Sequence, residues 1–268
     1  MMIFEMQKLL WAMRRAGRAV RRCLGGDLGA QRKANGDLIT KVDIEVNQIL
    51  QESLLNTFTE DGWLSEETNS CSERLTKRRV WVVDPIDGTK ELAYGIPEFA
   101  ISVALVEDGS PALAAVYNPV PGEMFTASRG GGAYFNVRSR QCQRPPGDRL
   151  VILASRSEVE AGKFEAFKSL AEVRPIGSIA YKLALIARGD GDGTFSLDPK
   201  NEWDIAAGVL LVAECGGRAT HRNGAAFTFN QPNTLVDGIV AARSGAYDRV
   251  QELIRQVSGS HAGLSPIP

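Results

Sequence analysis

The sequence is poor in the residues on which several classes of catalytic centre depend. It holds two histidines, His221 and His261, and neither lies near a strong motif, so a histidine-based zinc centre or a histidine-dependent triad is not indicated. Its four cysteines are scattered and include no C-x-x-C pair. This spacing predicts neither a disulfide framework nor a zinc site, and it favours a reducing, cytoplasmic environment.

An excess of charge of either sign is also missing. The chain has 31 lysines and arginines against 32 aspartates and glutamates, which gives a formal net charge of −1. Nucleic-acid-binding proteins usually carry a marked basic excess, so we expect no nucleic-acid partner and look for charge at a local site. At 268 residues, with 44% of them hydrophobic, the chain is long enough for one large domain or for two small ones that share an interface.

The N-terminal region lacks an apolar run that could cross a bilayer. Apolar residues recur with helical spacing across residues 3–24, but Arg14, Arg15 and Arg18 interrupt them. A signal peptide needs an uninterrupted apolar segment, and a membrane span needs a longer one. An organelle transit peptide would share the amphipathic pattern, but we interpret the stretch as the first helix of the core. We therefore expect no membrane partner.

The first half of the chain is predicted to hold two helices followed by strands. A capping box at Thr40–Asp43 precedes the second helix. Turn residues between short apolar segments indicate an antiparallel meander, with Gly130–Gly132 as a hairpin turn rather than a dinucleotide-binding loop. The predicted elements are a helix at 3–24, a second helix that ends near Thr57, a buried strand at 81–83 that ends at Asp84-Pro85, and strands at 99–106, 112–117, 123–128 and 133–136.

The second half changes character, because strands now alternate with helices. We place the domain boundary at Arg144–Gly147, which divides the chain into an α+β part at 1–146 and an α/β part at 147–268. The predicted elements are strands at 151–154 and 238–242 and helices at 158–171, 178–187, 206–215 and 246–257.

The motif richest in chemistry is Asp84-Pro85-Ile86-Asp87-Gly88-Thr89, which follows the apolar strand. Two carboxylates three residues apart at the end of a buried strand are costly unless a cation neutralises them. Oxygen ligands favour Mg²⁺ or Mn²⁺. Gly88 would let a phosphate approach the backbone, and Thr89 would begin a helix whose N-terminus attracts anions. The ordinary alternative is an Asx turn, since D-P and D-G pairs are common in loops.

Two further acidic positions also have ordinary alternatives. Glu66-Glu67 follows Trp63-Leu64-Ser65, and such a pair is often solvated at a surface. Asp204 stands at the start of a strongly apolar helix, where an aspartate commonly caps the helix. Taken alone, neither position identifies a site. Each nevertheless lies at the edge of a buried element, as does the Asp84–Asp87 pair.

Together the three acidic segments resemble the magnesium-dependent, lithium-sensitive phosphatase superfamily that includes inositol monophosphatase. The resemblance extends from Asp37-Leu38-Ile39-Thr40 to Gly216-Gly217. It implies an α/β fold, a layered αβαβα sandwich of the inositol monophosphatase/fructose-1,6-bisphosphatase type. The metal ligands that it implies are Glu66, Asp84, the carbonyl of Ile86, Asp87 and Asp204.

Three short segments of the sequence resemble the CysQ-type 3′(2′),5′-bisphosphate nucleotidases of sulfur metabolism. These marks are Leu64–Glu67, Asp87–Glu91 and Glu202–Asp204. The resemblance implies release of phosphate from adenosine 3′,5′-bisphosphate, which leaves AMP. The stretch Phe195–Lys200 departs from the aromatic-Pro-Arg pattern of that group. The alternative is an inositol monophosphatase, with or without activity on fructose 1,6-bisphosphate, and a third alternative is a catalytically silent relative.

The resemblance also implies roles for residues around the metals. Two or three Mg²⁺ ions would be bound, Mn²⁺ would be a substitute and Li⁺ an inhibitor, and the protein would be a monomer or a homodimer. The residues implied in catalysis are Asp43, Glu66 and Thr89, and those implied in binding a small phosphorylated substrate are Gly88, Thr89, Gly177, Ser178, Lys182 and Asp204. Asp43 also fits a capping box, Lys182 also fits a solvated helix face, and Arg156 is a further candidate for a second phosphate.

Overall fold

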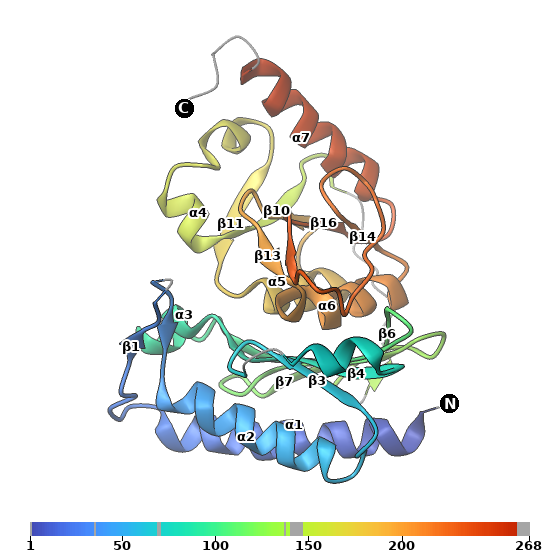
Figure 1. Ribbon diagram of the computed structural model, residues 1–268. Coiled ribbons are helices and arrows are strands. Elements are labelled where there is room, and N and C mark those ends of the chain that lie inside the picture. The colour runs from blue at the N-terminus through green and yellow to red at the C-terminus, as the bar shows by residue number, and fades with distance from the viewer. Residues whose placement is uncertain (1, 35, 69–70, 137, 140–146, 262–268) are drawn as a thin grey trace.

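Helices and sheets alternate in layers, as Figure 1 shows for the computed structural model. The structure describes residues 2–34, 36–68, 71–136, 138–139 and 147–261. From one side to the other, the layers are helices α1 and α2, a large sheet, helices α5 and α6, a smaller sheet, and helices α4 and α7 (Figure 1). The arrangement confirms the predicted αβαβα sandwich.

The bounds of the elements follow the chain order. The helices are α1 (Ile3–Cys23), α2 (Lys41–Leu55), α3 (Thr89–Ala93), α4 (Arg156–Glu160), α5 (Ile179–Arg188), α6 (Glu202–Glu214) and α7 (Tyr247–His261), with 3-10 turns η1 (Ser72–Thr76) and η2 (Glu165–Ser169). The strands of the first half are β1 (Gln31–Arg32), β2 (Leu38–Ile39), β3 (Gly62–Ser65), β4 (Arg79–Asp87), β5 (Ala100–Glu107), β6 (Ser110–Asn118), β7 (Glu123–Ser128), β8 (Gly132–Phe135) and β9 (Arg138–Ser139). Those of the second half are β10 (Val151–Ser155), β11 (Glu172–Ile176), β12 (Gly193–Phe195), β13 (Lys200–Asn201), β14 (Arg218–Thr220), β15 (Leu235–Val236) and β16 (Val240–Ala242).

The two N-terminal helices cover one face of the large sheet. The helical spacing of α1 buries Leu9, Met13 and Val20 completely, which confirms that this stretch is a core helix. Helix α2 begins at the predicted capping box: the Thr40 side chain accepts from the backbone of α2, and Asp43 accepts from the Thr40 N–H. The box fixes the first turn of α2, and with it the position of Asp43.

The large sheet has the strand order β3-β4-β5-β6-β7-β8-β9. The pairs from β4 to β9 are antiparallel, which confirms the predicted meander and the hairpin at Gly130–Gly132. Our prediction for β4 was wrong at both ends, because the strand runs from Arg79 through Asp87. It also missed β3, a short strand that pairs in parallel with β4, because four buried residues carry little periodicity.

The smaller sheet has the strand order β11-β10-β12-β16-β14. Strand β10 is parallel to β11 and β12, whereas β16 is antiparallel to β12 and β14. The alternation of strands and helices is confirmed for this half. The boundary that we predict at Arg144–Gly147 lies largely outside the described residues, so the division at residue 146 stays a prediction.

The predicted helix at 158–171 is wrong. Helix α4 ends at Glu160, because Gly162 takes a left-handed conformation (φ 76°) and closes a Schellman motif. In that motif the Gly162 N–H donates to Val159 and the Lys163 N–H donates to Glu158. The chain then forms η2 and the unpredicted strand β11. Helix α6 likewise begins at Glu202, ahead of the predicted 206, so Asp204 lies inside its first turn.

Helices α5 and α6 cross between the two sheets at Gly208. A Cβ added to Gly208 would lie 2.4 Å from Leu183 Cδ1 and 2.5 Å from Leu183 Cβ, closer than real contacts allow. The missing side chain therefore sets the distance between the two helices. That distance positions Asp204, in the first turn of α6, relative to Ser178, which caps α5.

Replacing Gly208 by alanine is expected to destabilise the protein by about 1–3 kcal/mol, because the methyl group must push α5 and α6 apart. Urea unfolding measures the change, with Ala213→Ser as the matched control on an exposed position of the same helix. Equal midpoints for the Gly208→Ala variant and the parent would show that the crossing is not tightly packed.

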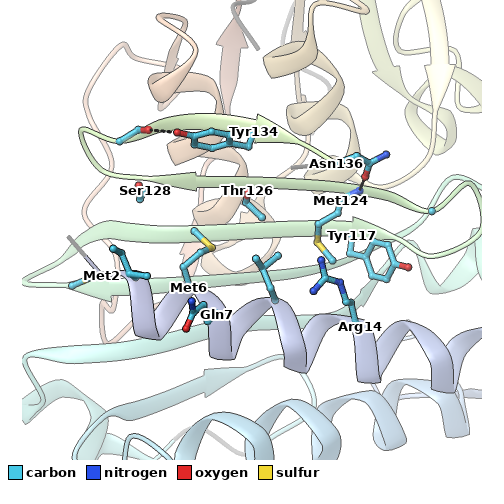
Figure 2. Close-up of a pocket in the computed structure, with 14 residues that line it drawn as sticks. Met2, Met6, Gln7, Arg14, Tyr117, Met124, Thr126, Ser128, Tyr134 and Asn136 are labelled. Atoms are coloured by element: carbon cyan, nitrogen blue, oxygen red, sulfur yellow. Dashed lines mark hydrogen bonds between the residues drawn. The ribbon is translucent and has the colours of Figure 1, made fainter. Parts of the chain in front are cut away.

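A cavity of about 500 Å³ lies between α1 and strands β6 to β8. Figure 2 shows Met6 and Met124 turned into it from the helix and the sheet. None of the described residues that line it is a carboxylate, so it offers no site for a divalent cation. Within the described ranges, no helix combines the length and the apolar character that a membrane span requires.

Candidate active site

The Asp84–Asp87 segment forms an irregularity in the strand pair β4–β5. Asp84 pairs with Ser102 and Asp87 with Ala100, so β4 holds one residue more than β5 in this interval. The Asp84 carboxylate accepts from the Ile86 N–H at 3.0 Å, which tightens the turn around Pro85. The Asx turn proposed as an ordinary alternative is therefore present. It directs both carboxylates toward one cavity of about 580 Å³.

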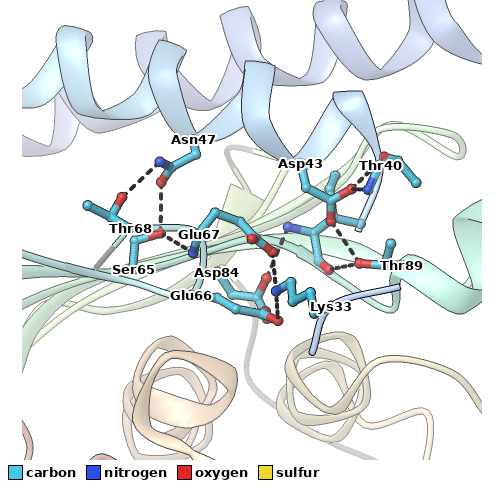
Figure 3. A network of polar contacts seen from close by, with 11 residues as sticks. Lys33, Thr40, Asp43, Asn47, Ser65, Glu66, Glu67, Thr68, Asp84 and Thr89 are labelled. Carbon is cyan, nitrogen blue, oxygen red and sulfur yellow. Dashed lines mark hydrogen bonds and ion pairs between the residues drawn. The ribbon is translucent and has the colours of Figure 1, made fainter. Parts of the chain in front are cut away.

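Glu66 reaches the same cavity because β3 runs parallel to β4. The Glu66 N–H donates to the Val83 carbonyl at 3.2 Å, directly beside Asp84. The end of β3 is held on α2, since the Ser65 hydroxyl donates to Asn47 at 2.7 Å (Figure 3). Parallel pairing thus brings the carboxyl ends of two neighbouring strands, and one acid from each, to one edge of the sheet.

Asp204 completes the acidic cluster from the other half of the chain. One carboxylate oxygen from each of Glu66, Asp84 and Asp204 lies within 4.8 Å of the others. Asp204 also occupies helix position N3 of a capping box, in which it accepts from the Asn201 N–H at 2.8 Å. Because this interaction uses one carboxylate oxygen, capping and participation in the cluster are compatible.

Burial and mutual repulsion shape the electrostatics of the cluster. The Asp84 side chain is 1% exposed. Burial, with the charges of Glu66 and Asp87 added, raises the pKa of Asp84 well above its usual value, and burial with Asp87 does the same to the pKa of Asp204. Burial also raises the pKa of Glu66 to about 7. The carboxylates therefore resist full ionisation at neutral pH unless a cation shares the site.

The donor set fits a hard divalent cation. All candidate ligands are oxygens: the carboxylates of Glu66, Asp84, Asp87 and Asp204 and the carbonyl of Ile86 line one cavity. The structure brings together Glu66, Asp84 and Asp204 most closely. This is the arrangement that the sequence predicts, although the ligand roles themselves stay a proposal.

Asp87 is shared between this cavity and helix α5. Its Oδ2 accepts from the Ser178 hydroxyl and from the Ala180 N–H, both at 2.6 Å. Burial raises the pKa of Asp87, while these two hydrogen bonds act against the shift. Ser178, which we predicted to contact substrate, therefore holds a candidate metal ligand in place. It also caps α5 by accepting from the Tyr181 N–H.

Thr89 links Asp43 to the Asp84–Asp87 turn, as Figure 3 shows. Its Oγ1 lies 2.8 Å from Asp43 Oδ1 and 3.0 Å from the Ile86 carbonyl oxygen. The hydroxyl has one proton, so it donates to one of these oxygens at a time. Burial raises the pKa of Asp43, although hydrogen bonds from Thr40 and Thr89 oppose the shift. Asp43 is thus both a capping-box residue and the partner of Thr89.

The backbone conformation at position 88 requires glycine, independently of the predicted close approach of a phosphate. Its φ is 96°, a value that side chains rarely allow, and an added Cβ would lie 3.1 Å from Phe99 Cβ. The helix that we predicted at Thr89 forms as α3, but it has only five residues. Both residues line the cavity, so their predicted contact with a phosphate stays open.

Lys33 is a site residue that the sequence did not single out. Its Nζ lies 2.8 Å from Glu66 Oε1 and 2.6 Å from Glu67 Oε1 (Figure 3). Burial lowers the pKa of Lys33, but the hydrogen bonds and charges of Glu66 and Glu67 together raise it. A loop of no evident periodicity carries Lys33, and only the pairing of β1 with β2 brings it to the acids. The predicted alternative of a solvated Glu66-Glu67 pair is therefore wrong.

Replacing Lys33 by methionine is expected to destabilise the protein without added metal by about 1–3 kcal/mol, because two half-buried carboxylates lose their partner. The same change should lower the Mg²⁺ concentration at half-saturation, since Lys33 and a metal compete for Glu66. Thermal unfolding across a Mg²⁺ titration measures both, and Lys77→Met, which removes an exposed pair with Glu73, is the control. If the melting temperatures of the Lys33→Met variant and the parent differed by the same amount at every Mg²⁺ concentration, Lys33 and Mg²⁺ would not compete for Glu66.

A second cavity of about 220 Å³ adjoins the first. It is lined by the predicted substrate residues Gly177, Ser178 and Lys182, and by the unpredicted Lys200. Lys182 is 2% exposed, so its alternative as a solvated lysine is wrong. Its Nζ donates to the carbonyls of Ile176 at 3.1 Å and Ser178 at 3.0 Å, and burial lowers its pKa to about 8.

Two of the predicted substrate contacts already have protein partners. The Gly177 N–H donates to Glu98 Oε2 at 2.8 Å. Arg156 forms an ion pair with the same oxygen at 2.6 Å. Glu98 thus ties the start of α4 to the segment before α5. Arg156 does not line either cavity among the described residues, which leaves its contact with a second phosphate without support.

Comparisons with known proteins give this geometry a context. The sequence matches the model of the inositol monophosphatase family over residues 5–259. An inositol-1-monophosphatase of Rhizobium meliloti is 34% identical over 227 residues, covering 81% of this chain and 85% of the relative. A fructose-1,6-bisphosphatase/inositol-1-monophosphatase of Thermotoga maritima is 29% identical and covers 82% of this chain and 84% of the relative. The crystal structure of the extragenic suppressor protein suhB from Bartonella henselae superposes with a TM-score of 0.83 at 29% identity, over 94% of this chain and 98% of that one.

Proposed function

Because the chain belongs to the inositol monophosphatase family and is thus a phosphatase, we propose that it hydrolyses inositol 1-phosphate or a related polyol or sugar phosphate. The observation that carries the proposal is the convergence of Glu66, Asp84 and Asp204 from β3, β4 and α6 on one cavity. The names of two relatives, an inositol-1-monophosphatase and a fructose-1,6-bisphosphatase/inositol-1-monophosphatase, support this substrate class.

The bisphosphate nucleotidase that we predicted first has weaker support. Two of the proteins described above are named as phosphatases of inositol and fructose phosphates, which favours the alternative. The motifs that suggested the nucleotidase lie in the common metal site or next to it, so they discriminate poorly between substrates. Hydrolysis of adenosine 3′,5′-bisphosphate therefore stays a prediction that the substrate panel below tests.

We assign Mg²⁺ as the metal, held by Glu66, Asp84, Asp87 and Asp204 and by the Ile86 carbonyl. When bound, Mg²⁺ supplies charge neutralisation for the phosphate and acidifies a bound water. The protein contributes by burying the metal-binding carboxylates and by holding them in fixed orientations. The Ser178 hydroxyl and the Ala180 N–H fix Asp87, and the capping box fixes Asp204. Pre-set charges of this kind need no rearrangement during the reaction.

Thr89 and Asp43 orient the attacking water in this proposal. With its proton donated to Asp43 Oδ1 at 2.8 Å, the Thr89 oxygen keeps lone pairs that accept a hydrogen bond from the water. As the water loses its proton to Thr89, Asp43 takes the threonine proton and becomes neutral, so the negative charge passes from Asp43 to the attacking oxygen; burial raises the pKa of Asp43 and so favours this transfer. The Thr40 N–H holds the other oxygen of Asp43 in place at 2.9 Å.

A substrate panel tests the proposal. Phosphate release is measured from inositol 1-phosphate, fructose 1,6-bisphosphate and adenosine 3′,5′-bisphosphate, with Mg²⁺, with Mn²⁺, with Mg²⁺ and Li⁺, and with EDTA. We expect Mg²⁺-dependent turnover of the inositol or fructose ester that EDTA abolishes. Turnover of the nucleotide alone would favour our first prediction. Turnover that persists in EDTA would contradict the metal site.

A further inference from the structure

The cavity between α1 and strands β6 to β8 exists because the helices cover only part of the large sheet. On this face, α1 packs against β5 and β6, and α2 packs against β4, whereas β7 and β8 continue the sheet beyond them. Alternate residues of a strand point to the same face. Those of β7 and β8 that face α1 form the floor of the cavity: Met124, Thr126, Ser128, Tyr134 and Asn136 (Figure 2).

Tyr117 of β6 closes one end of this cavity. Its ring packs on α1 at Gly17, where an added Cβ would lie 2.2 Å from Tyr117 Cε1. The Tyr117 hydroxyl accepts from Arg21 at 2.8 Å, and Arg21 also donates to the Pro119 carbonyl at 3.2 Å. The closed end of the cavity therefore lies beside a guanidinium group whose hydrogen-bond partners here are neutral.

The cavity is long and mainly apolar. Figure 2 shows Met2 at one end of its helical wall and Arg14 at the other, a span of about 18 Å at the helical rise of about 1.5 Å per residue. Its volume of about 500 Å³ is within the range of small-molecule sites. Met2, Met6 and Met124 contribute flexible side chains, which adapt to the shape of an apolar ligand.

Arg14 alone carries a charge among the described residues of the lining. Within the part of the chain that the structure describes, it forms no ion pair, and the sequence has no acidic residue between Glu5 and Asp27. The helix dipole does not account for this arginine either, because α1 ends at Cys23, more than two turns beyond it, and the dipole acts mainly on the last turn. The cavity thus combines an apolar channel with one cationic end.

We propose that this cavity binds a small amphipathic anion, whose aliphatic chain lies between Met6 and Met124 and whose carboxylate pairs with Arg14. The chain would remove apolar surface from water, and the guanidinium group would give the carboxylate a charged hydrogen bond. A narrow chain suits a cavity enclosed between a helix and a sheet better than a second copy of the protein does, because interfaces between subunits are broad surfaces.

The proposed site is separate from the phosphatase site. None of the described residues lines both this cavity and the cavity of the acidic cluster. The large sheet also separates α1 from α5 and α6 (Figure 1). Binding of the anion should therefore be the same with Mg²⁺ and with EDTA, and the same in the Asp84→Asn variant as in the parent. Failure of the proposed function and failure of this site are thus distinguishable.

Calorimetry with single-chain amphiphiles tests the site. The anions are hexanoate, octanoate and decanoate, and octan-1-ol and octylammonium are the neutral and cationic matches of octanoate. We expect the affinity to rise about threefold to fourfold for each added methylene group. Octanoate should bind at least about tenfold more tightly than octan-1-ol, since the charged hydrogen bond is among the strong ones. Octylammonium should bind most weakly of the three.

Variants assign the binding to this cavity. Arg14→Met should lower the affinity for octanoate about tenfold and change that for octan-1-ol less than about twofold. Arg18→Met, which removes an exposed arginine of the same helix, should change neither. Met6→Trp fills the cavity from the half-buried helical wall and should lower both affinities about tenfold or more. Melting temperatures show whether each variant is folded, and Ser128→Phe narrows the cavity from the sheet if Met6→Trp does not fold.

Four results would overturn the site. The first is that none of the anions binds. The second is equal affinity for octanoate and octan-1-ol, which would leave Arg14 without a role. The third is octanoate binding that the cavity-filling variants leave unchanged, which would place the anion on the outer, basic face of α1. The fourth is a parent protein that is a dimer by light scattering and a cavity-filled variant that is a monomer, which would assign the cavity to a second copy.

Discussion

The Asp84→Asn variant is expected to lose at least about 10³-fold in turnover and at the same time to unfold at a higher temperature in the absence of metal. Asp84 is buried beside Glu66, Asp87 and Asp204, so the neutral amide removes repulsion from the metal-free protein. The same change removes a ligand, so added Mg²⁺ should no longer raise the melting temperature, as a ligand of the folded state otherwise does.

Thermal unfolding and phosphate release, each with and without Mg²⁺, measure these effects. Asp108→Asn is the matched control, because Asp108 lies in an exposed turn with a φ of 49°, which asparagine tolerates. It should leave turnover and the Mg²⁺ response unchanged. An Asp84→Asn protein that still gains stability from Mg²⁺ as the parent does would show that the metal binds elsewhere.

The Thr89→Ala variant is expected to lower kcat by about 10²–10⁴-fold, because the water would lose the group that orients it and accepts its proton. Mg²⁺ affinity should change much less than turnover, since Thr89 contacts Asp43 and one assigned metal ligand, the Ile86 carbonyl, but none of the four carboxylates assigned to the metal. The contrast between a large effect on turnover and a small effect on metal binding distinguishes this role from that of Asp84.

Thr89→Ser is the matched control, since it keeps the hydroxyl and removes only a methyl group. It should retain most of the activity of the parent protein. The Mg²⁺ concentration at half-saturation is obtained from thermal unfolding, which does not depend on turnover. If Thr89→Ala and Thr89→Ser lost activity equally, packing of the threonine methyl would explain the effect and the proposed proton transfer would not.

Local chemistry made Asp84 and Asp87 predictable, whereas Glu66 and Asp204 were identified only when the three acidic segments were compared together with a known family. Asp84 and Asp87 lie at the end of an apolar strand, and Asp204 lies in the first turn of an apolar helix. Asp43 and Asp204 each occupy helix position N3 of a capping box, so the same short pattern that begins a helix also positions an acid. Several elements of the fold were predictable from periodicity, such as α1, the meander and α5, whereas the layered sandwich itself was implied by the family resemblance.

Lys33 and Lys200 were not predictable, because no local pattern indicates their position. Lys33 reaches Glu66 only through the pairing of β1 with β2, and Lys200 reaches the second cavity only through the pairing of β13 with β15. These ladders join short segments of two residues each, which have no usable periodicity. The prediction of a helix at 158–171 was wrong for a different reason. Gly162 adopts a left-handed conformation, which ends the helix although the surrounding sequence has a helical pattern.

The substrate depends on residues that the shared motifs do not include. The metal site is assembled from both halves of the chain, but the second cavity is lined mainly by residues that follow β9, among them Lys182 and Lys200. Sequence motifs near the acids therefore indicate the reaction, whereas we expect the lining of the second cavity to influence which phosphate ester fits. This division explains why the motifs around Glu66 and Asp87 did not separate a nucleotidase from an inositol monophosphatase.

The most direct test of the metal site is a crystal of the protein soaked in Mn²⁺ and measured at the manganese absorption edge. Manganese is suited to this test because it accepts the same oxygen ligands as Mg²⁺. We predict an anomalous difference peak between the carboxylates of Glu66, Asp84 and Asp204 that is missing in Asp84→Asn crystals. A peak elsewhere, or one that persists in the variant, would contradict the assignment of these acids to the metal.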